Sequence, residues 1–195
     1  MLYNVAYPNV GSPTQITDSI KENHLSTKET ISMMTVTFQG NPLTLKGEQL
    51  KAGDKMPEFT LTDNGLGTVR SNDLTGLKVF LTVPSLDTPV CDMEVRNFNQ
   101  KASELHGVHI YAVSMDLPFA QARWCGAHGI NNVQTLSDYK GHDFGKATGT
   151  FIEELALLTR AVFVVDDGGT VRHVEYVSEI TNHPNYDAVY AKMAE

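Results

Sequence analysis

The sequence predicts an α/β fold, in which a mixed central sheet carries helices on both faces. Two strand-then-helix units, at residues 78–107 and 109–125, favour parallel strands. A turn signal at 166–169 joins two later strands as a β-hairpin, and another at 40–41 adds an N-terminal β-hairpin. Chemistry in such sheets usually lies at the carboxyl ends of the parallel strands.

Residues 1–33 are rich in Ser, Thr and Asn and show no sustained hydrophobic period. We expect an N-terminal extension with little packing. The pair Met33-Met34 leaves two interpretations open, because translation can begin there. The extension is then either a disordered part of the native protein or not part of it. The folded domain is predicted to span residues 34–195.

The first half of the domain is expected to consist mainly of strands. Thr35–Gln39 and Pro42–Leu45 flank Gly40-Asn41, which is a two-residue turn signal. Residues 58–62 alternate like a half-exposed strand, and 68–70 form a short strand after a glycine-rich turn. Residues 78–83 are mostly β-branched, aliphatic or aromatic, so we expect a buried strand there.

The dipeptide Thr88-Pro89 predicts the start of a helix. Threonine is a good N-cap, and proline is favoured at the first helical position, where its missing N–H has no cost. Apolar residues then recur at steps of four and three, as on one face of a helix: Cys91, Val95, Phe98, Ala102 and Leu105. We expect this helix to end near Gly107.

The second half repeats the strand-then-helix order and closes with a hairpin and a helix. We expect a strand at 109–114, a short helix at 119–125 stopped by Gly126, a strand at 133–136 and a short helix through 147. Strands at 161–165 and 170–176 flank the second turn, and a last helix begins near Pro184.

Composition restricts the function. The 195 residues carry a net charge of −8, which argues against nucleic-acid or anionic-membrane binding. There is neither an apolar run of about 18 residues nor a secretory signal pattern, so we expect a cytoplasmic protein. Thiols stay reduced there, and the two cysteines are therefore better read as catalytic, redox-active or metal-binding than as a structural disulfide.

Cys91 falls in the first turn of the predicted helix, just beyond the buried strand. A free thiol has a pKa of about 8.5, so only about a few per cent is ionised at neutral pH. A helix N-terminus stabilises an anion by roughly 0.3–2 kcal/mol, and an added cation would make the thiolate the major form. Position alone leaves two interpretations, a nucleophile or a small buried apolar residue.

Three separate motifs carry a family resemblance. These are Pro84-x-x-x-Thr88-x-x-Cys91, the segment at 35–42, and Arg123-Trp124-Cys125-Gly126. From residue 34 onward the chain resembles the bacterial thiol peroxidases, an atypical two-cysteine branch of the peroxiredoxins. The resemblance implies a thioredoxin-like fold, antioxidant reduction of hydroperoxides without metal or other cofactor, thioredoxin as reductant, and a homodimer.

The resemblance also implies roles for five residues. Cys91 is expected to be the peroxidatic cysteine and to form a sulfenic acid. Cys125 is expected to resolve it through an intramolecular disulfide, after local unwinding around both cysteines. Arg160 would stabilise the thiolate and the developing oxygen anion, Thr88 would hydrogen-bond the sulfur while capping its helix, and Pro84 would shield the pocket from water.

Other interpretations are weaker. Arg160 could instead form a surface ion pair, and Cys125 could simply pack. Cys125-x-x-His128 is half of a zinc-binding pattern, but no second pair of ligands stands out. A disulfide oxidoreductase usually has a Cys-x-x-Cys pair, which is absent here. A non-enzymatic redox sensor stays open, because a sensor and an enzyme differ in turnover rather than in motif.

Overall fold

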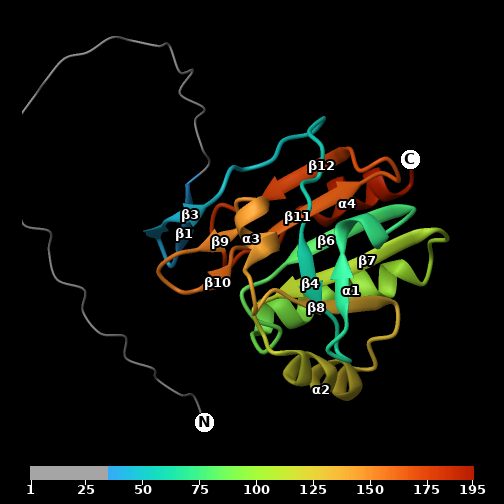
Figure 1. Ribbon diagram of the computed structural model, residues 1–195, viewed down its shortest axis with the longest axis horizontal. Coiled ribbons are helices and arrows are strands. Elements are labelled where there is room, and N and C mark those ends of the chain that lie inside the picture. Colours follow the sequence, from blue (N-terminus) through green and yellow to red (C-terminus); the bar gives the residue numbers. More distant parts are fainter. Residues whose placement is uncertain (1–34) are drawn as a thin grey trace, which may run out of the picture. The chain divides into compact units, whose positions relative to one another are not determined.

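The computed structural model describes residues 35–195, and the predicted extension lies outside them. A seven-stranded mixed sheet forms the centre of this part, in the order β12-β11-β6-β7-β8-β4-β5 (Figure 1). Its strands are β4 (Thr60–Thr62), β5 (Thr68–Arg70), β6 (Leu77–Thr82), β7 (Val108–Ser114), β8 (Val133–Ser137), β11 (Ala161–Val165) and β12 (Val171–Tyr176). Neighbours β6, β7 and β8 run parallel, and the other pairs are antiparallel.

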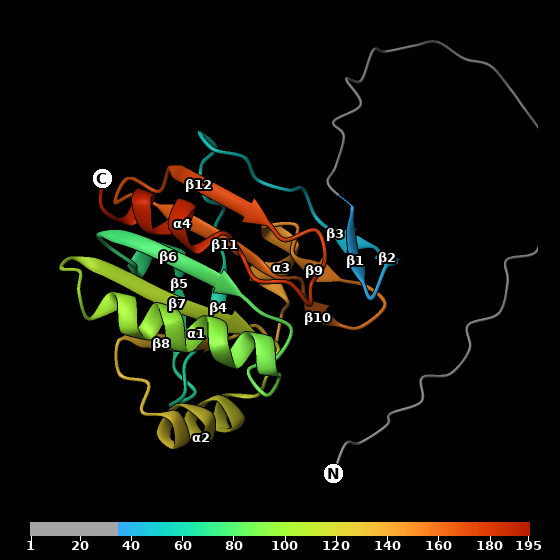
Figure 2. The ribbon, with the colours of Figure 1, turned by 180° about the vertical axis from the view of Figure 1, so that it is seen from behind.

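Helices cover both faces of the sheet, as predicted. The helices are α1 (Pro89–Ala102), α2 (Pro118–His128), α3 (Asp143–Ala147) and α4 (Tyr186–Met193). Alternate residues of β6 enter two separate cores: Val79 and Leu81 pack with α1, α2 and α4, whereas Phe80 packs in an aromatic cluster with α3. Figure 2 shows α1 in front of the sheet. Within residues 35–195, no helix is long and apolar enough to cross a membrane.

The predicted N-terminal hairpin is present as β1 (Val36–Phe38) and β2 (Asn41–Leu43). Its turn is Gln39-Gly40 rather than the predicted Gly40-Asn41, and both turn residues have positive φ, 51° and 78°. The predicted strand through Leu45 is divided. Leu45 belongs to β3 (Leu45–Lys46) in a small sheet with β9 (Phe151–Ile152) and β10 (Leu157–Leu158). These strands have only two residues each, which is too short to show the apolar–polar alternation that predicts a strand.

The helix carrying Cys91 begins at Pro89, as predicted, but ends at Ala102 instead of near Gly107. The reason lies in the backbone beyond it, where the N–H groups of the next residues bond to carbonyls three positions back. The hydroxyl of Ser103 also donates to the Gln100 carbonyl at 2.6 Å. Such local bonds compete with continuation of an α-helix.

The helix carrying Cys125 is longer than predicted. It continues past Gly126 to His128 and ends where Gly129 adopts a left-handed conformation at φ 64°. A glycine inside a helix costs only about 1 kcal/mol relative to alanine, whereas a left-handed C-cap favours glycine strongly. The second glycine therefore sets the helix end, and Cys125 lies in the last turn of α2.

Candidate active site

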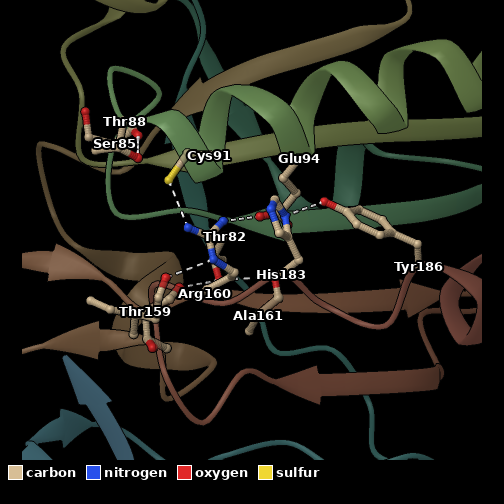
Figure 3. A network of polar contacts seen from close by, with 11 residues as sticks. Thr82, Ser85, Thr88, Cys91, Glu94, Thr159, Arg160, Ala161, His183 and Tyr186 are labelled. Atoms are coloured by element: carbon tan, nitrogen blue, oxygen red, sulfur yellow. Dashed lines mark hydrogen bonds and ion pairs between the residues drawn. The ribbon is translucent and has the colours of Figure 1, made fainter. Parts of the chain in front are cut away.

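Cys91 lies in the first turn of α1, where the loop from β6 enters the helix. Thr88 occupies the N-cap position with an extended backbone, and Pro89 follows it. The Cys91 side chain is completely buried, yet its Sγ atom accepts a hydrogen bond of 3.2 Å from Nη2 of Arg160 (Figure 3). A guanidinium group placed on the sulfur is not the environment of an apolar packing residue.

Arg160 directly precedes β11 and is only 1% exposed, so the alternative of a surface ion pair is wrong. Three of its nitrogens are used: Nη2 by Cys91, Nη1 by the Glu94 carboxylate, and Nε by the Ile180 carbonyl at 3.0 Å. Burial by itself lowers the pKa of Arg160, but the negative charges of Glu94 and Cys91 outweigh burial and raise it. The cation expected beside Cys91 is therefore present and fixed on three sides.

Glu94 is a buried partner of this group that sequence reasoning missed. Its side chain is completely buried on α1, and its Oε2 atom accepts a hydrogen bond from Arg160. Burial raises the pKa of Glu94 to about 7, against the opposing charge of Arg160. A signal was available in the sequence, because residues three apart share one helix face. A glutamate three residues beyond Cys91, on the buried face, requires a cationic partner.

The raised pKa of Glu94 predicts how the stability of the protein depends on pH. The folded protein binds the Glu94 proton more tightly than the unfolded chain, since the pKa rises from 4.5 to about 7. This contribution to stability is fully present below pH 4.5 and is lost as the pH rises through 7. We expect the free energy of unfolding to fall across this window relative to a Glu94→Gln variant. Urea denaturation at matched pH values measures the difference, and parallel curves would contradict the assignment.

The loop before Cys91 contains the other two predicted site residues. Pro84 is buried, and Thr88 is half-buried. Contrary to our expectation, the Thr88 side chain forms no capping hydrogen bond with α1. Its hydroxyl instead donates to the Ser85 carbonyl at 3.0 Å. A hydroxyl has a single proton to donate. In this conformation, therefore, that proton stabilises the loop and is not directed to the sulfur.

Asp116, which was not among the predicted site residues, binds the loop before Cys91 through hydrogen bonds. Its two oxygens accept hydrogen bonds of 2.8 Å from the hydroxyl of Ser85 and the N–H of Leu86. The hydroxyl of Ser114, at the end of β7, also donates to Asp116 at 2.8 Å. The neighbours β6 and β7 are parallel, so the residues that follow them meet at one sheet edge. This adjacency is the signal that could have identified Asp116.

Cys125 is half-buried in the last turn of α2, and both cysteines are free thiols. Its Sγ atom lies 3.4 Å from the hydroxyl of Thr135 on β8. Burial raises the pKa of Cys125, and the contact with Thr135 partly opposes this rise. Nε2 of His128, at the end of α2, lies 3.5 Å from a carboxylate oxygen of Asp92 on α1. The two cysteine-bearing helices therefore contact each other through a residue next to Cys91 and a residue three positions after Cys125.

Comparisons with known proteins identify the family of this chain. The family model described as Redoxin matches residues 51–190. Thiol peroxidases of Clostridium acetobutylicum and Bacillus subtilis are 54% and 51% identical over 156 residues, which are 80% of this chain and 95% and 93% of those proteins. A peroxiredoxin-like protein from Aquifex aeolicus has a TM-score of 0.77 at 42% identity, covering 83% of this chain and 96% of that one. The predicted thioredoxin-like fold is confirmed, and the chain belongs to the redoxin family, in its thiol peroxidase branch.

Proposed function

We propose that this thiol-dependent peroxidase reduces hydrogen peroxide and organic hydroperoxides at Cys91. The observation that carries the proposal is the buried guanidinium of Arg160, 3.2 Å from a sulfur in the first turn of a helix. The helix N-terminus and the guanidinium both favour the thiolate over the thiol. They thereby supply the nucleophile that peroxide reduction needs.

In the first step, the Cys91 thiolate attacks one peroxide oxygen and the O–O bond breaks. The leaving oxygen takes the electron pair and a proton and departs as an alcohol, or as water from hydrogen peroxide. Cys91 becomes a sulfenic acid. Arg160 stabilises the negative charge that develops on the oxygens, as a fixed cation does in a site closed to water.

Access to the sulfur depends on the loop from Pro84 to Thr88. Because Cys91 is completely buried, a peroxide reaches it only when neighbouring atoms move. We assign Pro84 the role of excluding water. Thr88 is assigned a hydrogen bond to the sulfur and the peroxide oxygen, which requires its hydroxyl to turn away from the Ser85 carbonyl. Asp116 restrains this movement, since it binds two groups of the loop.

In the second step, the Cys125 sulfur attacks the sulfenic sulfur, water leaves, and an intramolecular disulfide forms. A disulfide needs Cα atoms within about 7 Å of each other, with matching side-chain directions. Both sulfurs are held in helical turns, so we propose that the ends of α1 and α2 unwind first. Burial raises the pKa of Cys125, which favours its thiol form over the thiolate.

Thioredoxin is proposed to restore the two thiols, with transfer of the disulfide to its own pair of cysteines. A cytosolic location and antioxidant defence accord with this cycle, because it consumes a reduced thiol in every turn. A homodimer is proposed from the family. Steady-state peroxide consumption with thioredoxin and its reductase tests the function: an enzyme turns over many times, whereas a redox sensor reacts once per molecule.

Cys125→Ser separates the two chemical steps. We expect this variant to lose thioredoxin-supported turnover but to keep one rapid oxidation per molecule, since Cys91 and Arg160 stay intact. Non-reducing peptide mapping of the unmodified protein after one equivalent of peroxide should identify a Cys91–Cys125 bridge. An intermolecular bridge between two copies would contradict the proposed resolution step.

The single tryptophan, Trp124, reports on the same step. It is 7% exposed and stacks on His128 with ring centroids 4.9 Å apart. If α2 unwinds around Cys125, the Trp124 ring loses this packing, and its emission should differ between the reduced and the disulfide form. Cys125→Ser treated with peroxide is the matched control, because it is oxidised at Cys91 but forms no bridge. Identical spectra of the two redox states would count against unwinding.

A further inference from the structure

We propose that the N-terminal hairpin β1–β2 positions Arg160, through the carboxylate of Glu179 and the backbone of Ile180. The inference rests on the proposed role of Arg160. It assigns Glu179 as a positioning residue and gives the hairpin a part in catalysis. Figure 2 shows the hairpin at the end of the molecule toward which β12 points, the end where residues 178–181 follow that strand.

Ile180 connects the hairpin to the guanidinium directly. Its carbonyl accepts the hydrogen bond from Nε of Arg160 at 3.0 Å, and its N–H donates to the Thr37 carbonyl at 3.0 Å. The N–H of Thr37 donates in turn to the Ser178 carbonyl at 2.7 Å. Residues 178–180 therefore pair with β1 on one side and bind the arginine on the other.

The Glu179 carboxylate stabilises the pairing of residues 178–180 with the hairpin. Its Oε2 atom accepts from the hydroxyl of Thr37 at 2.8 Å and from the N–H of Gly40 at 3.0 Å. Its Oε1 atom accepts from the N–H of Gln39 at 3.1 Å, and from the hydroxyl and N–H of Thr181 at 2.8 and 3.2 Å. Burial opposes the charge, but these hydrogen bonds prevail and lower the pKa of Glu179 to about 2.

The same carboxylate explains the position of the hairpin turn. Gln39 adopts a left-handed conformation at φ 51°, which non-glycine residues rarely take. The N–H groups of Gln39 and Gly40 both bind Glu179, and these bonds offset the strain. The turn and the segment after β12 therefore hold each other in place.

The direction of each bond to Arg160 shows why this support matters. Nη1 and Nη2 bind Glu94 and Cys91, which both lie on α1. The bond from Nε goes to Ile180, which lies outside α1, so it restrains the plane of the guanidinium from a second segment of the chain. Catalytic groups need placement within about 0.5 Å and 10–20°. A looser Ile180 carbonyl would let the plane rotate away from the sulfur.

Glu179→Gln tests the proposal, because it keeps the shape but turns one acceptor oxygen into a donor. Asp166→Asn is the matched control. Asp166 accepts a hydrogen bond from the N–H of Thr170, at the end of the β11–β12 hairpin that lies away from Arg160. It does not contact Arg160. Two rates are measured without thioredoxin: the first oxidation by peroxide, and alkylation of Cys91 by iodoacetamide as a function of pH, in a Cys125→Ser background.

We expect Glu179→Gln to slow the first oxidation about tenfold and to shift the alkylation profile to higher pH, since the cation holds the thiolate less well. Asp166→Asn should change neither rate. A purely structural role of Glu179 would lower the melting temperature and leave both rates unchanged. Thr37→Val removes one of the five hydrogen bonds that the Glu179 carboxylate accepts, so it should slow oxidation less than Glu179→Gln does. It replaces Glu179→Gln as the test if that variant does not fold.

Arg160→Lys distinguishes failure of the positioning role of Glu179 from failure of the proposed role of Arg160. If Arg160→Lys slows oxidation while Glu179→Gln and Thr37→Val both match Asp166→Asn, the positioning role is refuted and the proposed function stands. If Arg160→Lys changes neither rate, the proposed role of the arginine itself fails, and the role of Glu179 fails with it.

Discussion

Replacement of Cys91 by serine is expected to abolish peroxide turnover, down to the rate of a reaction without enzyme. The reason is that the first step requires an ionised sulfur. A serine hydroxyl is not ionised at neutral pH, and neither the helix N-terminus nor Arg160 shifts it far enough. The coupled assay with thioredoxin measures this loss, with hydrogen peroxide and an alkyl hydroperoxide in parallel.

Cys125→Ser is the control for this experiment, because it also removes one thiol from the protein. It should retain the first oxidation, whereas Cys91→Ser should not react even once. Each variant replaces one sulfur by one oxygen in the same core and leaves the rest of that core intact, so both variants should fold. Appreciable turnover by Cys91→Ser would show that the reaction takes place at another group.

The surroundings of Cys91 could be predicted from sequence because they depend on local chemistry. The Thr88-Pro89 dipeptide determines where α1 begins, and a mostly apolar run determines the strand before it. Both signals act over a few residues. Similar local signals placed the two hairpins, whereas the end of α2 depended on which of two glycines took the left-handed conformation.

The rest of the site depends on contacts between distant residues. Arg160 was expected from the family resemblance, but its burial and its pairing with Glu94 bring together residues 66 positions apart in the sequence. The Thr88 hydroxyl was expected to cap the helix and to donate to the sulfur, but in the folded loop it donates to the Ser85 carbonyl. Asp116 and Glu179 lie far from Cys91 in sequence. No period or spacing rule connects them to the chemistry before the sheet edges are known.

Arg160→Met is expected to have the second-largest effect, on both activity and stability. Loss of a fixed cation at a developing oxygen anion typically lowers the rate by about 10²–10³. The substitution also leaves Glu94 completely buried without its partner. An uncompensated buried charge destabilises a protein by about 3–5 kcal/mol. The first-oxidation rate and urea denaturation measure the two effects. Because Arg160 lowers the pKa of Glu94, its loss raises that pKa further, and the destabilisation should increase as the pH rises.

A second substitution separates stability from catalysis. In Arg160→Met/Glu94→Gln the buried charge is gone, so the free energy of unfolding should recover most of the loss, while the oxidation rate should stay low. Arg160→Lys keeps one positive charge, but a single ammonium cannot reach Cys91, Glu94 and Ile180 together in the geometry of a guanidinium. We expect its rate to lie between those of the unmodified protein and Arg160→Met. Recovery of the oxidation rate in the double variant would mean that Arg160 only neutralises Glu94, and that the sulfur is activated by the helix alone.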